Sequence, residues 1–362
     1  MTRSRLRDLD IVIGDLPVGP NNAITDVPGV LVGHTTLSFD EPRVARTGVT
    51  VVVPCDGRIH EDNVFAAYHV FNGNGEMTGL PWIDETGLLG SPVAITNTNQ
   101  VGVVRDALVE HAVDRGMAGW ILPVVAETYD GFLNDIDGFH VTKEHVFQAL
   151  DSASDGQVAE GNVGGGTGMV CHSFKGGIGT SSRVAEAPGG PYTVGVLVQA
   201  NYGRRKHLRV DGVPVGREIG PDDVPLPRRT TGREGSIIIV VATDAPLVPV
   251  QCRRLAQRAT VGLARVGGVG HNSSGDIFLA FATGNHPSHD PNDDASPDSS
   301  ELVDLKMLPN NLIDSLFDAT AEAVEESILN ALTAAETTAG FQGTAHALPL
   351  DRLQEIMSEY RR

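Results

Sequence analysis

The 362-residue sequence predicts an α+β fold in which helices cover packed β-sheets. Three observations favour this class. Strand-like runs rich in Val and Ile interleave with segments of helical periodicity, so both kinds of element share one chain. Other strand-like runs are separated only by short Gly- and Pro-containing turns, which is typical of hairpins. The chain contains no internal repeat of roughly 20–50 residues, so a solenoid or a propeller is not expected.

In the first half of the chain, short strands between Gly and Pro turns are expected over 15–37. Further strands are expected at 47–54, 92–98 and 119–126, and helices at 62–71, 101–115 and 142–152. Two glycine-rich loops lie at 72–79 and 161–168. Tight turns, or backbone that lines a pocket, are the expected roles of these loops.

In the second half, the most β-like run of the protein begins at Ser236. Other strands are expected at 192–200 and 277–283, and helices at 246–266, 310–337 and 351–360. An Asp-, Pro- and Ser-rich loop is expected at 285–301. The one break in composition is the polar, Arg- and Pro-rich segment 203–235. Since no low-complexity linker divides the chain, we expect residues 1–362 to form a single domain.

Composition and charge narrow the partners and the compartment. With 41% hydrophobic and 20% charged residues, the chain can fill a globular core. A net charge of −19 argues against nucleic acid and anionic membrane as partners. No apolar run reaches the roughly 18 residues of a membrane span, and no secretory signal is evident. The cysteines Cys55, Cys171 and Cys252 lie far apart, so we expect free thiols and a cytoplasmic protein.

Gly235-Ser236 is a candidate for covalent chemistry. Ser236 opens a buried strand directly after a glycine and a long exposed segment. If the bond between the two residues were cut, Ser236 would carry a nucleophilic hydroxyl and an α-amine, whose ordinary pKa is about 8. The α-amine could then serve as the general base. The alternative is an ordinary first residue of a buried strand, and the pattern by itself favours that alternative.

Two polar residues lie at the start of the next expected strand. A β–α–β return would bring Ser274 and Asp276 close to Ser236. Ser274 could then hydrogen-bond the nucleophile, and Asp276 could orient Ser274 and balance charge. The alternative is a turn in which Ser and Asp cap backbone donors.

Three further candidates follow the ends of other expected strands. A buried carboxylate at Glu127 would suit a substrate ammonium group, and the phenol of Tyr129 and the amide of Asn201 would suit an oxyanion. The alternative for each of them is a turn residue that satisfies backbone groups.

Several common sites are disfavoured by pattern. Neither glycine loop matches a dinucleotide or phosphate-loop motif, and no GxSxG motif supports a nucleophile elbow. The 12 histidines form no HExxH motif and no zinc-like cluster with cysteine. The loop that contains His286, His289 and Asp290 lacks the residue order of an EF-hand, so we expect a solvated acidic loop there. We therefore expect neither a cofactor nor a metal.

Taken together, motifs along nearly the whole chain resemble one family, the DmpA-type aminopeptidases, which comprises L-aminopeptidase/D-esterases and β-peptidyl aminopeptidases. The motifs are 24–30 (ITDVPGV), 72–79 (NGNGEMTG), 95–98 with 102–106, 125–131 (VAETYDG), 161–169 (GNVGGGTGM), 235–238 with 242–247, and 274–281 (SGDIFLAF).

The resemblance implies a precursor that cleaves itself between Gly235 and Ser236 into an α chain, 1–235, and a β chain, 236–362. It implies an αββα four-layer sandwich that resembles N-terminal nucleophile hydrolases but differs in connectivity. It also implies assembly of the αβ units as homotetramers. The expected activity is hydrolysis of small peptides, amides or esters with a free N-terminal amine, through an acyl-enzyme on Ser236.

The resemblance also implies roles for the site residues. Ser274 and Asp276 match the supporting pair, although some members have Glu at the second position and Asp is shorter. Tyr129 and Asn201 match the oxyanion donors, and Glu127 matches the group that holds the substrate amine. The base, either the Ser236 α-amine or the Ser274/Asp276 pair, stays open.

The alternatives to hydrolysis differ in chemistry. Ornithine acetyltransferases share the layout but use a threonine nucleophile, so Ser236 favours hydrolysis over acyl transfer. A sheet-based binding protein without turnover is the non-enzymatic alternative. The preferred N-terminal residue, α-L, D or β, depends on the shape of the pocket and does not follow from the sequence.

Overall fold

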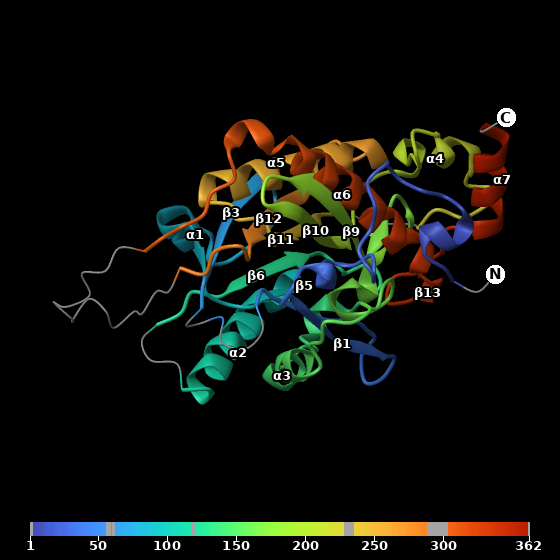
Figure 1. Ribbon diagram of the computed structural model, residues 1–362. Coiled ribbons are helices and arrows are strands. Elements are labelled where there is room, and N and C mark those ends of the chain that lie inside the picture. Colours follow the sequence, from blue (N-terminus) through green and yellow to red (C-terminus); the bar gives the residue numbers. More distant parts are fainter. Residues whose placement is uncertain are drawn as a thin grey trace.

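The computed structural model describes residues 3–55, 59, 62–116, 120–227, 235–287 and 303–360. Two β-sheets are stacked face to face, and helices cover the outer face of each sheet (Figure 1). The chain therefore forms four layers in the order α, β, β, α, and the expected sandwich is confirmed.

The first sheet has four strands and lies below the other in Figure 1. In spatial order they are β1 (Leu31–Phe39), β2 (Ala45–Val53), β5 (Val93–Asn97) and β6 (Val124–Thr128). Only the β5–β6 pair is parallel. The helices α2 (Val101–Asp114) and α3 (Lys143–Asp151) cover its outer face, where Val49 and Val51 of β2 pack against Val104 and Val146.

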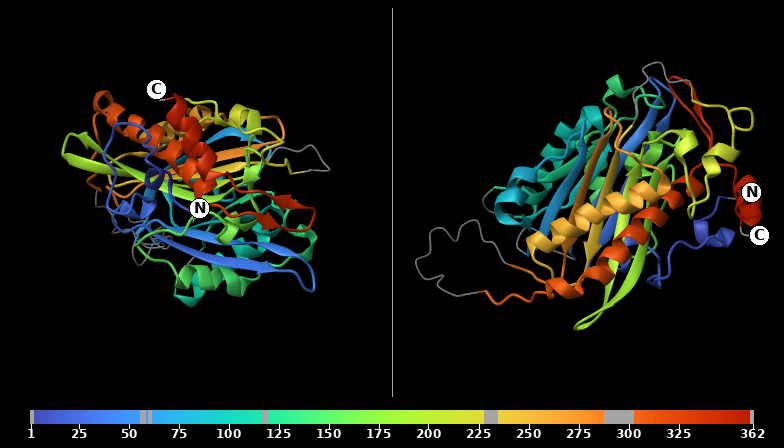
Figure 2. Two further views of the ribbon diagram at one scale, coloured as in Figure 1. Left: turned by 90° about the vertical axis from the view of Figure 1, so that its right-hand side faces the viewer. Right: turned by 90° about the horizontal axis from the view of Figure 1, so that it is seen from above.

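The second sheet has six strands. In spatial order they are β4 (Leu88–Leu89), β3 (Val64–Gly73), β12 (Gly275–Ala282), β11 (Ile237–Thr243), β10 (Gly190–Ala200) and β9 (Gly177–Ala187). The helices α5 (Pro249–Val266) and α6 (Asp314–Ala334) lie side by side across its outer face (Figure 2).

Strand β11 is apolar on both faces because both are buried. Ile237 and Ile239 point toward the helices, and Ile238 and Val240 point toward the other sheet. This double burial explains why the run after Ser236 is the most β-like of the sequence.

Short elements surround the two sheets. They are α1 (Leu80–Thr86), the 3₁₀ turn η5 (Gly164–Gly168), β7 (Val170–Cys171), β8 (Phe174–Lys175), α4 (Val215–Glu218), β13 (Thr338–Ala339), β14 (Thr344–Ala345) and α7 (Leu350–Tyr360). The described N-terminal segment lies near α7 (Figure 1). No helix in the described ranges is long and apolar enough to span a membrane. All three cysteines are buried, and none of them forms a disulfide, as expected.

The expected helix at 62–71 is wrong, because this segment forms β3. A short apolar run is consistent with a buried helix or a buried strand, and sequence periodicity cannot separate them. The β-branched and aromatic residues Val64, Phe65 and Tyr68 fit a pleated surface, and the pairing of β3 with β12 and β4 decides the conformation.

Other differences concern boundaries. The strand expected at 119–126 begins at Val124 and continues to Thr128, and residues 117–119 lie outside the described residues. Helix α5 begins at Pro249, because proline fits only the first turn of a helix. Helix α6 covers less than the expected 310–337, and strand β9 was not predicted. Most of the expected loop at 285–301 lies outside the described residues.

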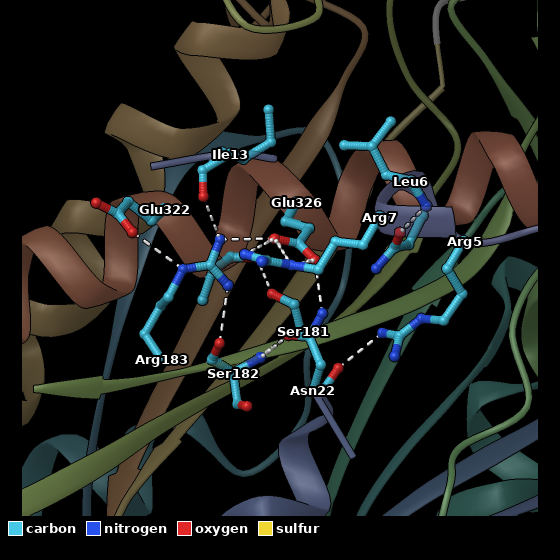
Figure 3. A network of polar contacts seen from close by, with 12 residues as sticks. Arg5, Leu6, Arg7, Ile13, Asn22, Ser181, Ser182, Arg183, Glu322 and Glu326 are labelled. Atoms are coloured by element: carbon cyan, nitrogen blue, oxygen red, sulfur yellow. Dashed lines mark hydrogen bonds and ion pairs between the residues drawn. The ribbon is translucent and has the colours of Figure 1, made fainter. Parts of the chain in front are cut away.

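A buried ionic network ties the N-terminal segment and β9 to α6 (Figure 3). The fully buried guanidinium of Arg183 donates to Glu322 at 3.0 Å and to Glu326 at 2.7 Å. Arg7 and Asn22 also donate to Glu326, at 2.8 and 2.6 Å. Each of the two carboxylates thus faces at least one cation, which is the arrangement that makes a buried charge tolerable.

Candidate active site

The β11–α5–β12 unit brings the two predicted serines together. Strands β11 and β12 are parallel neighbours, with Ile237 opposite Asp276. Ser236 directly precedes β11, and Ser274 directly precedes β12. The structure therefore has the β–α–β return that was expected from the sequence.

Ser236 is buried, and its hydroxyl oxygen accepts a hydrogen bond from the Gly275 N–H at 2.9 Å. A backbone donor at this position would stabilise negative charge on Oγ as the hydroxyl loses its proton. Gly275 also packs on the 72–79 loop, since a Cβ added to it would lie 2.6 Å from the Gly75 Cα. A close backbone approach therefore holds the donor in place.

Ser274 Oγ lies between two acceptors, the Gly235 carbonyl and an Asp276 carboxylate oxygen, each at 2.6 Å. A serine hydroxyl has a single hydrogen and can donate it to only one of them. Both contacts are hydrogen bonds at once only when Asp276 is protonated and donates to Ser274. Burial raises the pKa of Asp276 to about 6, although bonds from Ser274 and the Ile237 N–H oppose the rise. The pair can therefore change its proton arrangement near neutral pH.

Asn201 follows β10 and packs against the Gly235-Ser236 bond. Its N–H donates to the Ser236 carbonyl at 3.1 Å, and its side-chain amide donates to the Tyr129 carbonyl at 2.8 Å. The Val170 N–H donates to Asn201 Oδ1 at 2.8 Å, which fixes the orientation of the amide. A Cβ at residue 235 would lie 1.7 Å from the Asn201 carbonyl oxygen, so only glycine fits before Ser236.

Tyr129 lines the same pocket but is not aligned with the Gly235 carbonyl. Its side chain is 41% exposed, and a Cβ added to Gly131 would lie 2.3 Å from the phenol oxygen. The phenol thus lies over Gly131, and no hydrogen bond joins it to Gly235 or Ser236 within the described structure. The structure brings Tyr129 to the site without aligning it as an oxyanion donor.

Glu127 is the last residue but one of β6, rather than the first residue past a strand. Its side chain is buried, and it accepts hydrogen bonds from the Thr98 hydroxyl and, at 3.1 Å, from the Glu76 N–H. Burial raises its pKa, and these two bonds partly oppose the rise. Among the described residues no Lys or Arg forms a salt bridge with it. A buried carboxylate that faces a pocket without a cation is a suitable acceptor for a substrate ammonium group.

One pocket of about 180 Å³ connects these groups. Its wall contains Asn74, Thr98, Glu127, Tyr129, Phe132, Val170, Asn201, Gly235, Ser236 and Gln342, among others. Ser274 and Asp276 lie behind Ser236 and support it from the β12 side. Among the described residues, no group of three or more His, Cys, Asp or Glu side chains could hold a metal ion.

Several functional groups had no role assigned from the sequence. Thr98 and the Glu76 N–H hold Glu127, and the Gly275 N–H holds Ser236. Phe132 and Gln342 form the wall of the pocket on the side of the β13–β14 hairpin. Thr98 and Glu76 both lie in motifs that carry the resemblance, but backbone donors leave no signal in the identity of a residue.

The chain belongs to peptidase family S58, whose pattern matches residues 22–346. It is 46% identical to β-peptidyl aminopeptidase BapA of Sphingosinicella microcystinivorans, with 99% of this chain and 93% of the relative covered. These matches confirm the family that the motifs predicted.

Two solved structures have the same fold over nearly the full length. A β-aminopeptidase of a Burkholderia species is 53% identical with a TM-score of 0.92, and the match covers 98% of this chain and 99% of the other. An L-aminopeptidase D-Ala-esterase/amidase of Ochrobactrum anthropi is 44% identical with a TM-score of 0.91, and 99% of each chain is covered. The latter is described as a prototype of the serine aminopeptidases and a variant of the Ntn hydrolase fold.

The expectation of an aminopeptidase of the DmpA type is thereby confirmed. None of these matches supports acyl transfer of the ornithine acetyltransferase type.

Proposed function

We propose that the protein is a self-processing serine aminopeptidase with Ser236 as its nucleophile. The observation that carries the proposal is the arrangement at one peptide bond. The Gly235 carbonyl accepts from Ser274 at 2.6 Å, while the neighbouring Ser236 Oγ accepts from the Gly275 N–H at 2.9 Å. The electrophile and the nucleophile are therefore both held by hydrogen bonds beside an acid.

Self-cleavage would begin with attack of Ser236 Oγ on the carbonyl carbon of Gly235. The new C–O bond replaces the C–N bond, and the proton of the hydroxyl passes to the departing nitrogen. Negative charge develops on the Gly235 oxygen, where Ser274 is positioned to donate. Water then hydrolyses the ester, leaving a carboxylate on Gly235 and a free α-amine on Ser236. The products would be chains 1–235 and 236–362, and both would belong to one catalytic domain.

Turnover of substrate would use the same groups. The substrate ammonium binds Glu127, its carbonyl lies at Ser236, and acyl transfer to Oγ releases the amine of the remainder. Asn201 is the proposed oxyanion donor, with Tyr129 after a movement of its side chain away from Gly131. The base is the Ser236 α-amine or the Ser274/Asp276 pair. Because two relatives of 53% and 46% identity carry β-aminopeptidase names, we propose that substrates with an N-terminal β-residue are accepted.

A panel of aminoacyl p-nitroanilides with α-L, D and β residues tests this proposal. We expect hydrolysis of one or more β-aminoacyl substrates by the purified protein, and a loss of turnover of roughly 10⁶-fold in Ser236→Ala, the order of loss on removal of a catalytic serine nucleophile. The matched control is each substrate with an acetylated amine, which should be hydrolysed at least about 100-fold more slowly. Equal hydrolysis of acetylated substrates, or full activity of Ser236→Ala, would refute the proposal. A cytoplasmic location and a homotetramer stay predictions.

A further inference from the structure

Lys175 is one of the largest fully buried side chains in the protein, and it is not part of the pocket wall. Its ammonium donates to the carbonyls of Gly176 at 2.8 Å and Gly166 at 3.2 Å. Within the described ranges no carboxylate forms a salt bridge with it. Burial lowers its pKa to about 7. A buried ammonium group without a counter-ion destabilises a fold. The two groups that Lys175 binds therefore indicate why it is present.

The first group that Lys175 holds is the turn η5. A Cβ added at Gly166 would lie 2.4 Å from the Ile178 nitrogen, so the turn lies tightly against β9. The Gly166 carbonyl is buried there, and a buried carbonyl needs a donor. The Lys175 ammonium supplies one donor and the Met169 N–H supplies another at 3.2 Å.

The second group is the hairpin that follows the turn. Lys175 pairs with Val170 across β7 and β8, and the Gly176 N–H donates to the Met169 carbonyl at 2.9 Å. The ammonium therefore joins the turn η5, through the Gly166 carbonyl, to the residue that follows β8, through the Gly176 carbonyl. Val170 is the residue between them, and its backbone position depends on both.

Val170 connects this assembly to the active site. Its N–H donates to Asn201 Oδ1 at 2.8 Å, so the Nδ2 group of the amide is directed toward Tyr129 and the pocket. Without the Val170 donor, only the bond from Nδ2 to the Tyr129 carbonyl would hold the amide, and its position relative to a developing oxyanion would be less firmly fixed. A small shift of Val170 is therefore sufficient to weaken an oxyanion donor.

We propose that Lys175 is a positioning residue of the oxyanion site: its ammonium joins the Gly166 turn to the β7–β8 hairpin, and thereby holds the Val170 N–H that orients the Asn201 amide. The proposal rests on the proposed function in one respect, namely that Asn201 is an oxyanion donor. Lys175 itself touches neither the substrate nor Ser236.

A double-mutant cycle tests this coupling in the processed enzyme. Lys175→Met keeps the length of the side chain and removes the donor, and we expect kcat to fall about 10- to 100-fold with KM within about threefold. Asn201→Ala should lower kcat by roughly 10²–10³-fold, the usual range for loss of an oxyanion donor. The kcat of the double variant should lie within about threefold of the kcat of Asn201→Ala, because Lys175 acts through that amide. Activity is expressed per mole of processed chain, measured from intact mass.

Arg3→Met is the matched control. The Arg3 guanidinium also donates to two backbone carbonyls, those of Leu332 and Leu348 at 3.0 Å each, but these groups do not belong to the pocket wall. We expect it to lower the melting temperature while kcat stays within about twofold. If Lys175→Met does not yield folded protein, Lys175→Gln is the alternative variant. It retains an amide donor, so it should lower kcat by a smaller factor while KM stays unchanged.

Three outcomes separate the possibilities. Unchanged kcat in the folded Lys175 variant would overturn the proposal, and so would a double variant whose loss equals the product of the two single losses. An Asn201→Ala enzyme with normal kcat would instead contradict the proposed oxyanion role, and the inference about Lys175 would fail with it. In that last case the Ser236→Ala result still reports independently on the nucleophile.

Discussion

Carboxylates are buried in two regions of this protein, but their surroundings differ. Glu326 in the ionic network accepts hydrogen bonds from Arg183, Arg7 and Asn22 (Figure 3). The shortest hydrogen bond from each of these three residues is 2.6–2.8 Å long. In the pocket, Glu127 and Asp276 face only hydroxyl and N–H donors among the described residues. The carboxylates Glu326, Glu127 and Asp276 are all buried, so the difference lies in whether a cation of the protein balances the charge.

The pKa directions follow from this difference. Burial acts to raise the pKa of Glu326, but Arg7, Arg183 and Asn22 outweigh it and the pKa is lowered. Burial dominates at Glu127 and Asp276, whose pKa values are raised. The charge of Glu326 is balanced within the fold, whereas Glu127 and Asp276 have no counter-ion among the described residues, an arrangement that is common at functional sites. Substitutions in the two regions should therefore have opposite effects.

The largest expected effect is on stability, in Arg183→Met. This change leaves Glu322 and Glu326 buried with fewer cations, and we expect the free energy of unfolding to fall by about 3–5 kcal/mol. The kcat of the folded fraction should stay within about twofold, because the network does not line the pocket. Denaturant unfolding and activity assays measure the two quantities.

The control for Arg183 is Arg253→Met. Arg253 pairs with Asp84 at 2.6 Å, but the two side chains are 48% and 52% exposed. An exposed pair should contribute less than about 1 kcal/mol. Equal destabilisation by the two substitutions would mean that burial does not decide the strength of these ion pairs.

The next effect is on activity, in Glu127→Gln. We expect kcat/KM for substrates with a free amine to fall by roughly 10²-fold, since truncating a buried charge pair costs about 3 kcal/mol. Stability should not fall, because an uncompensated buried charge is removed. The control is Glu76→Gln, the same change at a neighbouring exposed side chain. If Glu76→Gln lowered kcat/KM as much as Glu127→Gln, the amine site would be assigned to the wrong carboxylate.

The smallest effect concerns pH and Asp276→Asn. The pKa of Asp276 in the folded state is raised to about 6 from an ordinary value of 3.8, so the folded state binds more protons than the unfolded state between these values. Stability of the unsubstituted protein therefore falls as pH rises through this window. The amide introduced by the substitution cannot ionise, so the variant should gain about 1–3 kcal/mol relative to the parent between about pH 4 and pH 7.

Melting temperatures at several pH values measure this effect. Glu326 supplies the opposite case, because its lowered pKa gives stability that is present above about pH 4.5 and lost as pH falls below that value. A difference between Asp276→Asn and the parent that did not change with pH would contradict the raised pKa. The kcat of the same variant distinguishes the two candidate bases, since the Ser236 α-amine would remain functional.

The fold was largely predictable from the sequence where burial acts on both faces of a strand. The apolar run after Ser236, the helix after Pro249 and the strand at Gly275 each carry a strong pattern, and together they required Ser236 and Asp276 to be neighbours. Residues 62–71 show the limit of such reasoning, because only pairing with β12 makes this apolar run a strand.

Four side chains of the candidate site were named from the sequence, whereas its backbone donors and the Thr98 side chain were not. Ser236, Ser274, Asp276 and Glu127 carry their chemistry in their identity. The Gly275 N–H and the Glu76 N–H act as donors only because distant segments approach closely, and no residue type encodes that approach. The orientation of Tyr129 over Gly131 likewise depends on packing within the pocket.

The most direct test of the central claim is the intact mass of the purified protein under denaturing conditions. We predict two chains, 1–235 and 236–362, whose masses sum to that of the full chain plus one water, and a single unprocessed chain for Ser236→Ala. A single full-length chain that hydrolyses aminoacyl amides, or cleavage at a bond other than Gly235–Ser236, would contradict the account.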